Sequence, residues 1–383
     1  MNLVALKMLI GDRLKYIALV AGVAFAALLI TQQASIFTGY TLEIGAWIRD
    51  TGAVDLWVSD PQMEHVEDFK PLTDTALNRV RSVSGVAWAV PIYKGYLKSR
   101  LPDGTLVNAR VIGLDDATLA GGPPEMASGH LSDLRGDDAV IVNEEDLNGQ
   151  LALHRGGENR PLRVGDHISL NDHDARVVGT FRATHEFFWQ PVVYTTYSQA
   201  LTWAPQERKL LTYVLVKVRP DESVSAVAER IHQQTRLLAR TTHEFDWDTT
   251  AWVLKKTGIL VNFGITIALG FVIGLLVAGQ TFYTFVLDNL RPFAAIKAMG
   301  ASNGMVLRML CVQVIVVAAI GYGIGLGAAT VSGAILSRGG LAFQMAWQIP
   351  VFGAVAVLIC CLAAGCLGML RVLRLEPAIV FKG

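Results

Sequence analysis

Residues 257–287 read TGILVNFGITIALGFVIGLLVAGQTFYTFVL, without one charged side chain between Lys256 and Asp288. A helix needs about 20 apolar residues to cross about 30 Å of hydrocarbon, and a charge near the bilayer centre costs at least about 2.5 kcal/mol. Three further charge-free windows are long enough, and they lie at residues 16–42, 309–337 and 339–370. The sequence therefore predicts four membrane-spanning helices.

The first window could also belong to a cleaved signal peptide. Lys7, Arg13 and Lys15 precede an apolar run centred on residues 17–30, as in a signal peptide. The region before this run is long, however, and residues 31–34 (TQQA) lack the small-x-small cleavage pattern. We therefore expect a retained membrane anchor.

The charges are unevenly divided along the chain. Of 33 basic and 33 acidic residues, 23 basic and 30 acidic lie in residues 43–256, and 10 basic and 3 acidic lie elsewhere. The zero net charge excludes a protein that coats nucleic acid, which needs a surplus of positive charge. We expect an anchor region at 1–42, an outer domain at 43–256 and a second membrane region at 257–383.

Short loops indicate the orientation in the membrane, because Lys and Arg remain on the cytoplasmic side. Basic residues cluster before the first window, in the loop between the second and third windows, and in the tail. The turn between the third and fourth windows carries only Arg338. Both termini and residues 288–308 should therefore be cytoplasmic, with residues 43–256 outside.

The outer domain has the pattern of a mixed α/β fold, with a β-rich stretch between two strand–helix–strand halves. A Gly/Pro-rich surface loop is expected at 120–128, and a hairpin is expected to turn at 171–174. Strands are expected at 53–59, 86–92, 95–100, 107–112, 139–142, 162–170, 175–181 and 211–218, and helices at 73–83 and about 220–234. All four cysteines lie at 311–366, so no disulfide can form in this domain.

Glycines recur four residues apart within the spans, as in helices that approach closely in lipid. The pairs are Gly270 with Gly274, Gly321 with Gly325, and Gly323 with Gly327. The run 323–328 formally matches GxGxxA, but no strand precedes it, which excludes a dinucleotide fingerprint. No G-x-x-x-x-G-K-[ST] occurs, so the chain cannot itself hold a nucleotide in a P-loop.

Other polar residues leave two interpretations open. Asn262, Gln280 and Gln313 lie within spans, where amides either line a pathway or join neighbouring helices, and we favour the second.

All eight histidines lie in the outer domain, and THEFFW at 184–189 resembles THEFDW at 242–247. Neither segment is H-E-x-x-H, so we expect surface structure and no metal site, with a ligand role as the alternative.

The loop between the second and third windows contains a short amphipathic helix pattern. A proline opens it at 292, Phe293, Ile296 and Met299 recur on one face, and Gly300 suits a C-cap. Such a helix either lies among lipid headgroups or docks into a cytoplasmic protein. In the docking interpretation, a charge in Phe293→Asp should disrupt the apolar face.

This loop resembles the motif of the FtsX-like, MacB-type permease superfamily, close to R-E-x-A-x-L-K-A-[LM]-G-A-[ST]. The chain reads RPFAAIKAMGAS at 291–302, and its tail RVLRLEPA at 371–378 resembles the family ending of basic residues and D-P-A. The order of spans is also similar, and segments at 6–26 and 270–284 look most like DevC-type permeases. Pro292 and Glu376 depart from the usual Glu and Asp.

The resemblance implies a membrane α-helical protein with a mixed α/β periplasmic domain of porter-like and sabre-like parts, the latter near 107–182. It implies a type VII ABC exporter permease in the bacterial inner membrane, with an amphipathic helix at residues 3–16 along the inner leaflet. Its coupling helix would comprise Arg291, Pro292, Phe293, Ala294, Ala295, Ile296, Lys297, Ala298, Met299 and Gly300. A cytoplasmic C-terminal motif would comprise Arg371, Arg374, Glu376 and Pro377.

The family further implies a homodimer with two copies of a separate ATPase, which would hold the ATP and Mg²⁺. DevC-type members also work with a periplasmic adaptor and an outer-membrane channel, and would expel hydrophobic or bulky substrates. We expect no cofactor, metal, catalytic residue or nucleic acid for this chain, and therefore no enzyme. The alternatives are an FtsX-like mechanotransmission protein that activates a periplasmic enzyme, and a receptor or adhesion protein without an ATPase.

Overall fold

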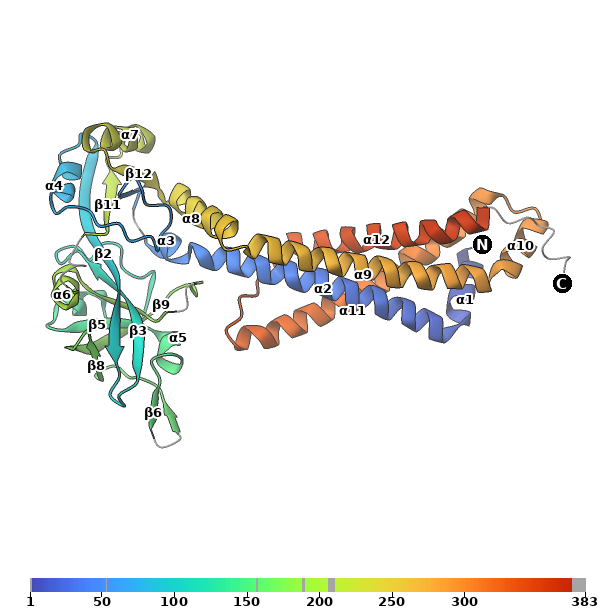
Figure 1. The fold of residues 1–383 in the computed structure, drawn as a ribbon, viewed down its shortest axis with the longest axis horizontal. Helices are drawn as coiled ribbons and strands as arrows, with labels where there is room; N and C mark the ends of the chain where they lie inside the picture. The colour runs from blue at the N-terminus through green and yellow to red at the C-terminus, as the bar shows by residue number, and fades with distance from the viewer. Residues whose placement is uncertain (1, 53, 156–157, 188–189, 206–210, 374–383) are drawn as a thin grey trace. The chain divides into compact units, whose positions relative to one another are not determined.

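The computed structural model of the chain describes residues 2–52, 54–155, 158–187, 190–205 and 211–373 (Figure 1). The chain divides into two compact units, one of Met1–Thr41 with Thr257–Gly383 and the other of Leu42–Lys256. We call the first the helical unit and the second the α/β unit.

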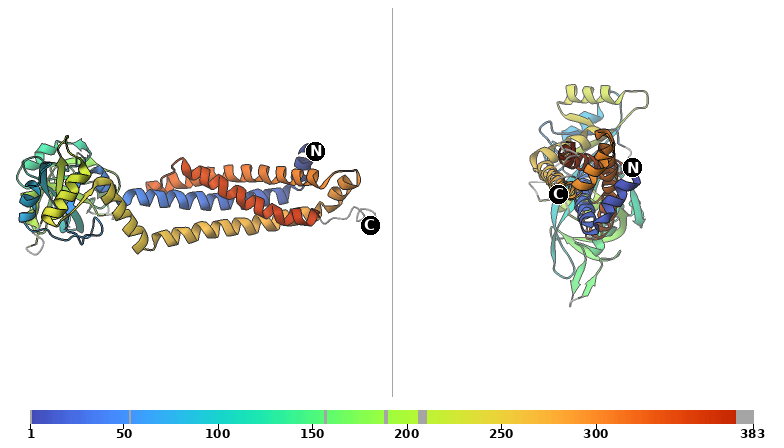
Figure 2. Two further views of the ribbon diagram at one scale, coloured as in Figure 1. Left: turned by 90° about the horizontal axis from the view of Figure 1, so that it is seen from above. Right: turned by 90° about the vertical axis from the view of Figure 1, so that its right-hand side faces the viewer.

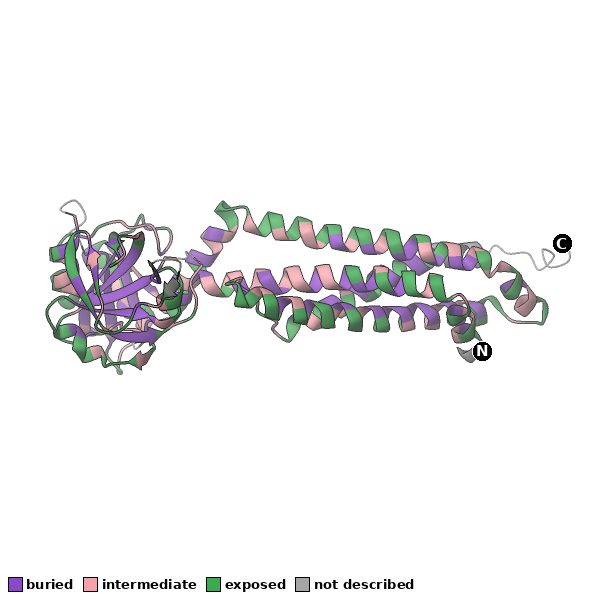
Figure 3. Cartoon of the chain, turned by 90° about the horizontal axis from the view of Figure 1, so that it is seen from below, coloured by how far each residue is buried: buried purple, intermediate pink, exposed green. Residues whose placement is uncertain are grey.

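The helical unit is built from long apolar helices, seen from further directions in Figure 2. Those long and apolar enough to cross a membrane are α2 (Arg13–Ile44), α9 (Ile259–Asp288), α11 (Asn303–Arg338) and α12 (Gln348–Leu373). Buried and exposed residues alternate around them (Figure 3), and exposed positions include Leu276 and Ile335. Apolar residues on an outer face suit lipid, so the predicted fold class of four apolar helices is confirmed.

The amino-terminal segment forms a helix of its own, α1 (Asn2–Gly11), which is shorter than the expected helix at 3–16. The break has a local cause: the Asp12 carboxylate accepts a hydrogen bond of 3.3 Å from the Lys15 backbone N–H, which caps the start of α2. Ala5 and Leu9 are buried in the core of the helical unit. The Gln313 side chain donates a hydrogen bond of 2.7 Å to the Ala5 carbonyl, so this amide joins two helices as we expected.

The α/β unit contains two strand–helix–strand halves, as predicted, although the last strand of the second half was not among the expected strands. The first is β1 (Leu56–Ser59), α4 (Thr75–Arg81) and β2 (Val86–Arg100), and the second is β11 (Tyr213–Val218), α7 (Val224–Thr235) and β12 (Leu238–Thr241). Their strands adjoin in the order β12-β1-β11-β2. Because side chains alternate along a strand, Leu56 and Val58 pack in the core with the buried faces of α4 and α7, and Trp57 faces the opposite core.

Between these halves lies the predicted β-rich part, and the sheet continues through it as β2-β3-β10-β5-β9-β4. Its strands are β3 (Leu106–Leu114), β4 (Glu125–Ser128), β5 (Ala139–Asn143), β8 (His167–Leu170), β9 (His173–Arg182) and β10 (Val192–Thr196), and β6 (Leu153–Arg155) pairs with β7 (Glu158–Arg160). The short helices are α3 (Ala46–Asp50), η1 (Leu131–Arg135), α5 (Glu144–Asn148), α6 (Tyr197–Trp203) and α8 (Thr242–Lys256).

Strand β2 joins the two parts and corrects one expectation. The sequence predicts separate strands at 86–92 and 95–100, but the structure has one continuous strand of 15 residues. Its first half pairs with β11 and its second half pairs with β3. Gly95 does not break it, because the missing side chain leaves room for Tyr93, whose hydroxyl would lie 2.5 Å from a Cβ at position 95.

The predicted hairpin is confirmed. Leu170 and His173 pair across a two-residue turn of Asn171 and Asp172, whose φ angles are 50° and 67°. Two left-handed residues produce the turn that matches the twist of a hairpin, and Asn and Asp tolerate this conformation. The first strand begins at His167 and not at 162.

Trp57→Ala should lower the free energy of unfolding by about 3–5 kcal/mol, the usual cost of an aromatic side chain lost from a core. Trp57 is fully buried, and its ring contacts those of Trp47, Tyr213 and Phe245. Thermal unfolding of the full chain in detergent, followed by near-ultraviolet circular dichroism, measures the loss. The control Trp247→Ala changes a ring that is 65% exposed and should cost under about 0.5 kcal/mol. Equal losses would contradict the core position of Trp57.

Candidate functional site

Helix α10 (Leu290–Ala298) is the short helix expected between the second and third spans. Pro292 lies in its first turn, where a missing N–H leaves no hydrogen bond unmade. Gly300 has a φ of +96°, and the next amide, of Ala301, donates a hydrogen bond of 3.2 Å to the Ile296 carbonyl. This left-handed glycine ends the helix, and the Ser302 hydroxyl then accepts a bond of 3.3 Å from the Met305 N–H to begin α11.

The prediction that Phe293, Ile296 and Met299 share one apolar docking face is wrong. Phe293 is fully buried in the core of the helical unit, Ile296 is half-buried, and Met299 is 79% exposed. Because a helix turns 100° per residue, positions three apart rotate by about 60° and positions six apart by about 120°. Phe293 therefore anchors α10 inside its own unit, and a charge in Phe293→Asp would disturb that core before any contact with another protein.

The exposed side of α10 carries other residues of the expected coupling helix. Arg291 and Pro292 are exposed at its start, and Ala298, Met299 and Gly300 at its end. Ala294 is buried, and Ala295 and Lys297 are partly buried. The surface available to another protein is thus basic at one end and apolar at the other.

The C-terminal motif expected at Arg371, Arg374, Glu376 and Pro377 is largely outside the described residues. Arg371 lies within α12, and the other three lie beyond Leu373.

Four of the glycines singled out in the spans lie against α2. A Cβ added to Gly274 would come within 2.5 Å of the Ala26 Cβ, and one added to Gly325 within 2.4 Å of the Ala24 carbonyl oxygen. Gly270 and Gly321 approach the same helix, and their added Cβ atoms would lie 3.2 Å from Leu29 and 2.7 Å from Val23.

The third glycine pair differs. Gly323 and Gly327 are exposed, and an added Cβ would meet nothing within 4 Å at either position. The structure therefore separates the pairs that pack from the pair that does not.

The α/β unit contains a buried cluster of charges on its central strands. Lys94 on β2 and Arg110 on β3 have fully buried side chains. The Glu67 carboxylate lies 2.6 Å from the Lys94 ammonium and 3.6 Å from the Arg110 guanidinium, and it accepts a hydrogen bond of 2.5 Å from the Tyr96 hydroxyl. Arg110 also pairs with Glu186. The cluster thus joins two cations to two carboxylates.

Burial and pairing set the protonation of this cluster. Burial lowers the pKa of Lys94 to about 7, against the attraction of Glu67. Burial alone would raise the pKa of Glu67, but the Lys94 and Arg110 charges hold it below its ordinary value. Lys94 also lies 4.3 Å from the centre of the Trp47 ring, a cation–π contact that offsets part of the lost hydration.

This cluster is not among the sites predicted from the sequence, although the sequence contains a signal for it. Lys94 lies between two stretches taken as strands, and Arg110 lies inside one of them. A charged residue in a strand that is apolar on both sides is unusual unless it has a partner. The partners Glu67 and Glu186 come from distant loops, so the sequence alone does not indicate the pairing.

The two similar histidine segments have different structures. In the second, Glu244 accepts bonds of 2.8 and 2.9 Å from the Thr241 N–H and hydroxyl, which caps the start of α8, and His243 is exposed. In the first, His185 and Glu186 lie in an irregular segment after β9 and pair with Glu43 and Arg110. No group of three His, Cys, Asp or Glu side chains able to hold a metal occurs among the described residues.

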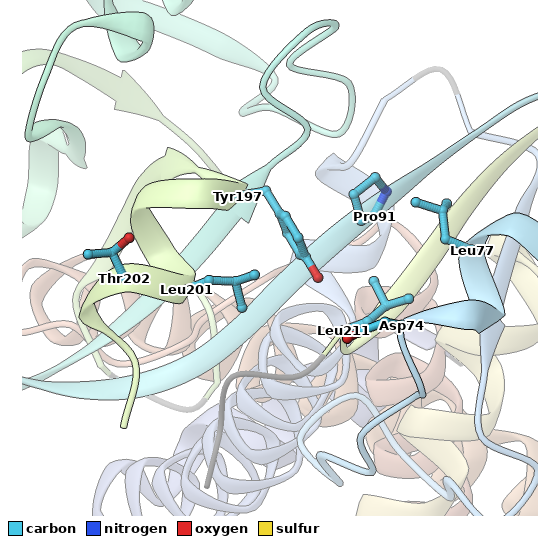
Figure 4. A pocket seen from close by; sticks show the side chains of 7 residues that line it. All are labelled: Asp74, Leu77, Pro91, Tyr197, Leu201, Thr202 and Leu211. Carbon is cyan, nitrogen blue, oxygen red and sulfur yellow. The ribbon is translucent and has the colours of Figure 1, made fainter. Parts of the chain in front are cut away.

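A groove of about 580 Å³ lies beside α6 in the α/β unit. Its lining is apolar at Leu77, Pro91, Leu201 and Leu211, and Asp74 and Thr202 contribute polar groups. Figure 4 shows the Tyr197 ring between Leu201 and Pro91, so both parts of the unit contribute to the groove. The lining offers contact area for an apolar group and no cluster of catalytic side chains.

Comparisons with known proteins find two families along the chain. Residues 17–234 match the MacB-like periplasmic core domain, and residues 263–377 match the FtsX-like permease C-terminal domain. No curated protein matches the chain.

Two solved structures are also similar to the chain. The extracellular domain of the noncanonic ABC-type transporter YknZ from Gram-positive bacteria has 14% identity and a TM-score of 0.31, covering 49% of this chain and 98% of that one. The periplasmic region of MacB from Actinobacillus actinomycetemcomitans has 15% identity and a TM-score of 0.36, covering 55% and 96% respectively.

Gly325→Ala should destabilise the helical unit by about 1–3 kcal/mol, because the added methyl group has no room against α2. The melting temperature of the full chain in detergent, measured by fluorescence-detected size-exclusion chromatography after heating, reports the change. Gly323→Ala, two residues away on the same helix, meets nothing and should melt like wild type. The packing described for α11 would be contradicted if Gly323→Ala were the less stable variant.

Glu67→Gln should cost about 3–5 kcal/mol, because it leaves the buried Lys94 without its carboxylate partner. Chemical unfolding of the full chain, followed by fluorescence, measures the cost. Glu229→Gln changes an exposed carboxylate on α7 and should be nearly neutral. A neutral Glu67→Gln would show that the cluster is not paired as described.

Proposed function

Because the chain belongs to the MacB-like, FtsX-like family of ABC transporter permeases, we propose that it is the membrane subunit of a type VII ABC exporter. In this proposal a separate ATPase binds and hydrolyses ATP with Mg²⁺ and moves the helical unit. The motion of the α/β unit then expels a hydrophobic or bulky substrate. The chain itself is a non-catalytic subunit.

The observation that carries the proposal is the way α10 is held. Its Phe293 side chain is buried in the core of the helical unit, and its two ends expose Arg291 and Met299. A short helix that is anchored on one side and free on the other can transmit a push from a bound protein to the spans on either side of it. We propose that α10 is the coupling helix and that the ATPase binds its exposed side.

The distribution of basic residues supports the orientation that this role requires. Arg291 and Lys297 lie on α10, Arg308 lies near the start of α11, and a further basic cluster precedes the first span. Because short cytoplasmic loops retain Lys and Arg, both termini and α10 lie on the cytoplasmic side in this proposal. The α/β unit is then periplasmic.

The proposed assembly contains two copies of this chain and two copies of the ATPase. We further propose the DevC subtype, on the resemblance of residues 6–26 and 270–284, with a periplasmic adaptor and an outer-membrane channel as partners. The groove beside α6 is available to a periplasmic partner or substrate.

Gentle detergent extraction of the tagged chain from its native membranes, followed by mass spectrometry, tests the proposal. We expect a P-loop ATPase in equal amount, and an adaptor beside it would support export. An ATPase without an adaptor would favour the mechanotransmission alternative. A homodimer without an ATPase, under conditions that preserve such complexes, would contradict the proposal.

Met299→Asp should reduce the amount of ATPase that co-purifies and leave the melting temperature unchanged, since Met299 is 79% exposed. Phe293→Ala should instead lower the free energy of unfolding by about 3–5 kcal/mol, because Phe293 is fully buried. The melting temperature should fall with it. ATPase binding that is unaffected by Met299→Asp would place the contact elsewhere on the cytoplasmic surface.

A further inference from the structure

Residues 183–187, which we call the strap, connect β9 toward β10 without regular structure. Their position therefore depends on contacts other than sheet hydrogen bonds. The Thr184 N–H donates to the Asp50 carboxylate at 2.7 Å, and the Thr184 hydroxyl donates to it at 3.2 Å. The Phe187 N–H donates to the Glu43 carbonyl at 3.3 Å. Both ends of the strap are thus attached to residues 43–50.

The two side chains in the middle of the strap have opposite partners. His185 Nδ1 lies 3.4 Å from the Glu43 carboxylate, and Glu186 pairs with Arg110 in the buried charge cluster. Glu43 belongs to the last turn of α2, and Arg110 belongs to β3. Residues 42–44 of α2 belong to the α/β unit, so the strap connects two segments of that unit, residues 43–50 and β3.

These two pairs respond differently to pH. Glu186 with Arg110 is a permanent pair above the acid range, because the guanidinium stays charged. His185 with Glu43 is an ion pair only while the imidazole is protonated. The contact of Glu186 with Arg110 is thus constant near neutral pH, whereas the contact of His185 with Glu43 varies with pH.

The charges around His185 favour its protonated form. Glu43 raises the pKa of His185 above its ordinary value, and Glu145 and Asp146 on α5 act in the same direction, against the effect of burial. Burial raises the pKa of Asp146 itself to about 6. Glu186 and Arg110, next along the strap, neutralise one another.

We propose that the strap is a latch that protonated His185 closes onto Glu43, and that loss of this proton loosens the attachment of the strap to residues 43–50 while Glu186 stays on Arg110. The latch lies within the α/β unit and does not depend on the proposed transport function. In a permease it would make the position of residues 43–50 within the outer domain sensitive to external pH.

The direction of the pH dependence follows from the linkage between protonation of His185 and folding. A histidine whose pKa is raised by folding contributes stability that is complete below its unfolded value of about 6.5. This contribution is lost as the pH rises through the folded pKa. The latch is therefore closed in mild acid and open in mild alkali.

Hydrogen exchange of the full chain in detergent, followed by mass spectrometry at about pH 5.5 and about pH 8, tests the latch. After correction for the intrinsic exchange rate, we expect the amides of the strap to exchange about three- to tenfold faster at the higher pH, the range for a charge-assisted contact. Peptides from β5 and β10 report whether the fold is intact. Equal corrected rates at both pH values would overturn the proposal without any variant.

Variants identify the group that titrates. His185→Gln should abolish the pH dependence, and Glu43→Gln should weaken it. His243→Gln, in the similar but exposed segment, and Asp146→Asn should both retain it. The assignment to His185 is wrong if the dependence survives in His185→Gln or disappears in Asp146→Asn.

Discussion

A charged side chain is expensive in hydrocarbon, and this constraint divides the chain into its two units. Four long helices are free of charge along their apolar windows, and 53 of the 66 charged residues lie in residues 43–256. Within these charge-free windows no ion pair can join the helices, and lipid tails are as apolar as their own side chains. Close packing remains, and it requires small residues where helices approach. Gly274 and Gly325 permit the contact with α2, where any larger residue would collide.

Burying a charge is also unfavourable within the α/β unit, but there each buried cation lies beside a carboxylate that offsets the lost hydration. Lys94 and Arg110 are buried on adjacent strands, and each lies beside a carboxylate from a distant segment. A buried pair adds little net stability over an apolar pair, whereas a buried charge without a partner is strongly destabilising. The cluster therefore selects one arrangement of Glu67 and of the strap around the sheet. The permanent pair of the strap and its titratable pair with Glu43 both depend on this arrangement.

The features that the sequence predicted are those that depend on near neighbours. Four spans follow from the length of charge-free windows, and the hairpin turning at Asn171 and Asp172 follows from turn chemistry. The strand–helix–strand halves follow from alternating and helical periodicities. The sequence divided strand β2 wrongly because Gly95 resembles a break. The strand accepts a glycine at this position because the Tyr93 ring occupies the space of the missing side chain. Strands β6, β7, β10 and β12 were missed, and β4 replaces part of the expected surface loop at 120–128.

By itself, the sequence determined the membrane character of this protein, its division into units, the short helix α10 and the family of permeases to which it belongs. These depend on local composition and motif, because the cost of charge in lipid and the chemistry of caps and turns act over a few residues. The tertiary structure alone decided that Phe293 points into the core and Met299 does not, and which glycine pairs meet α2. It also brought His185 to Glu43 and Glu186 to Arg110. Partners so far apart in the chain are chosen by packing, which no single segment encodes.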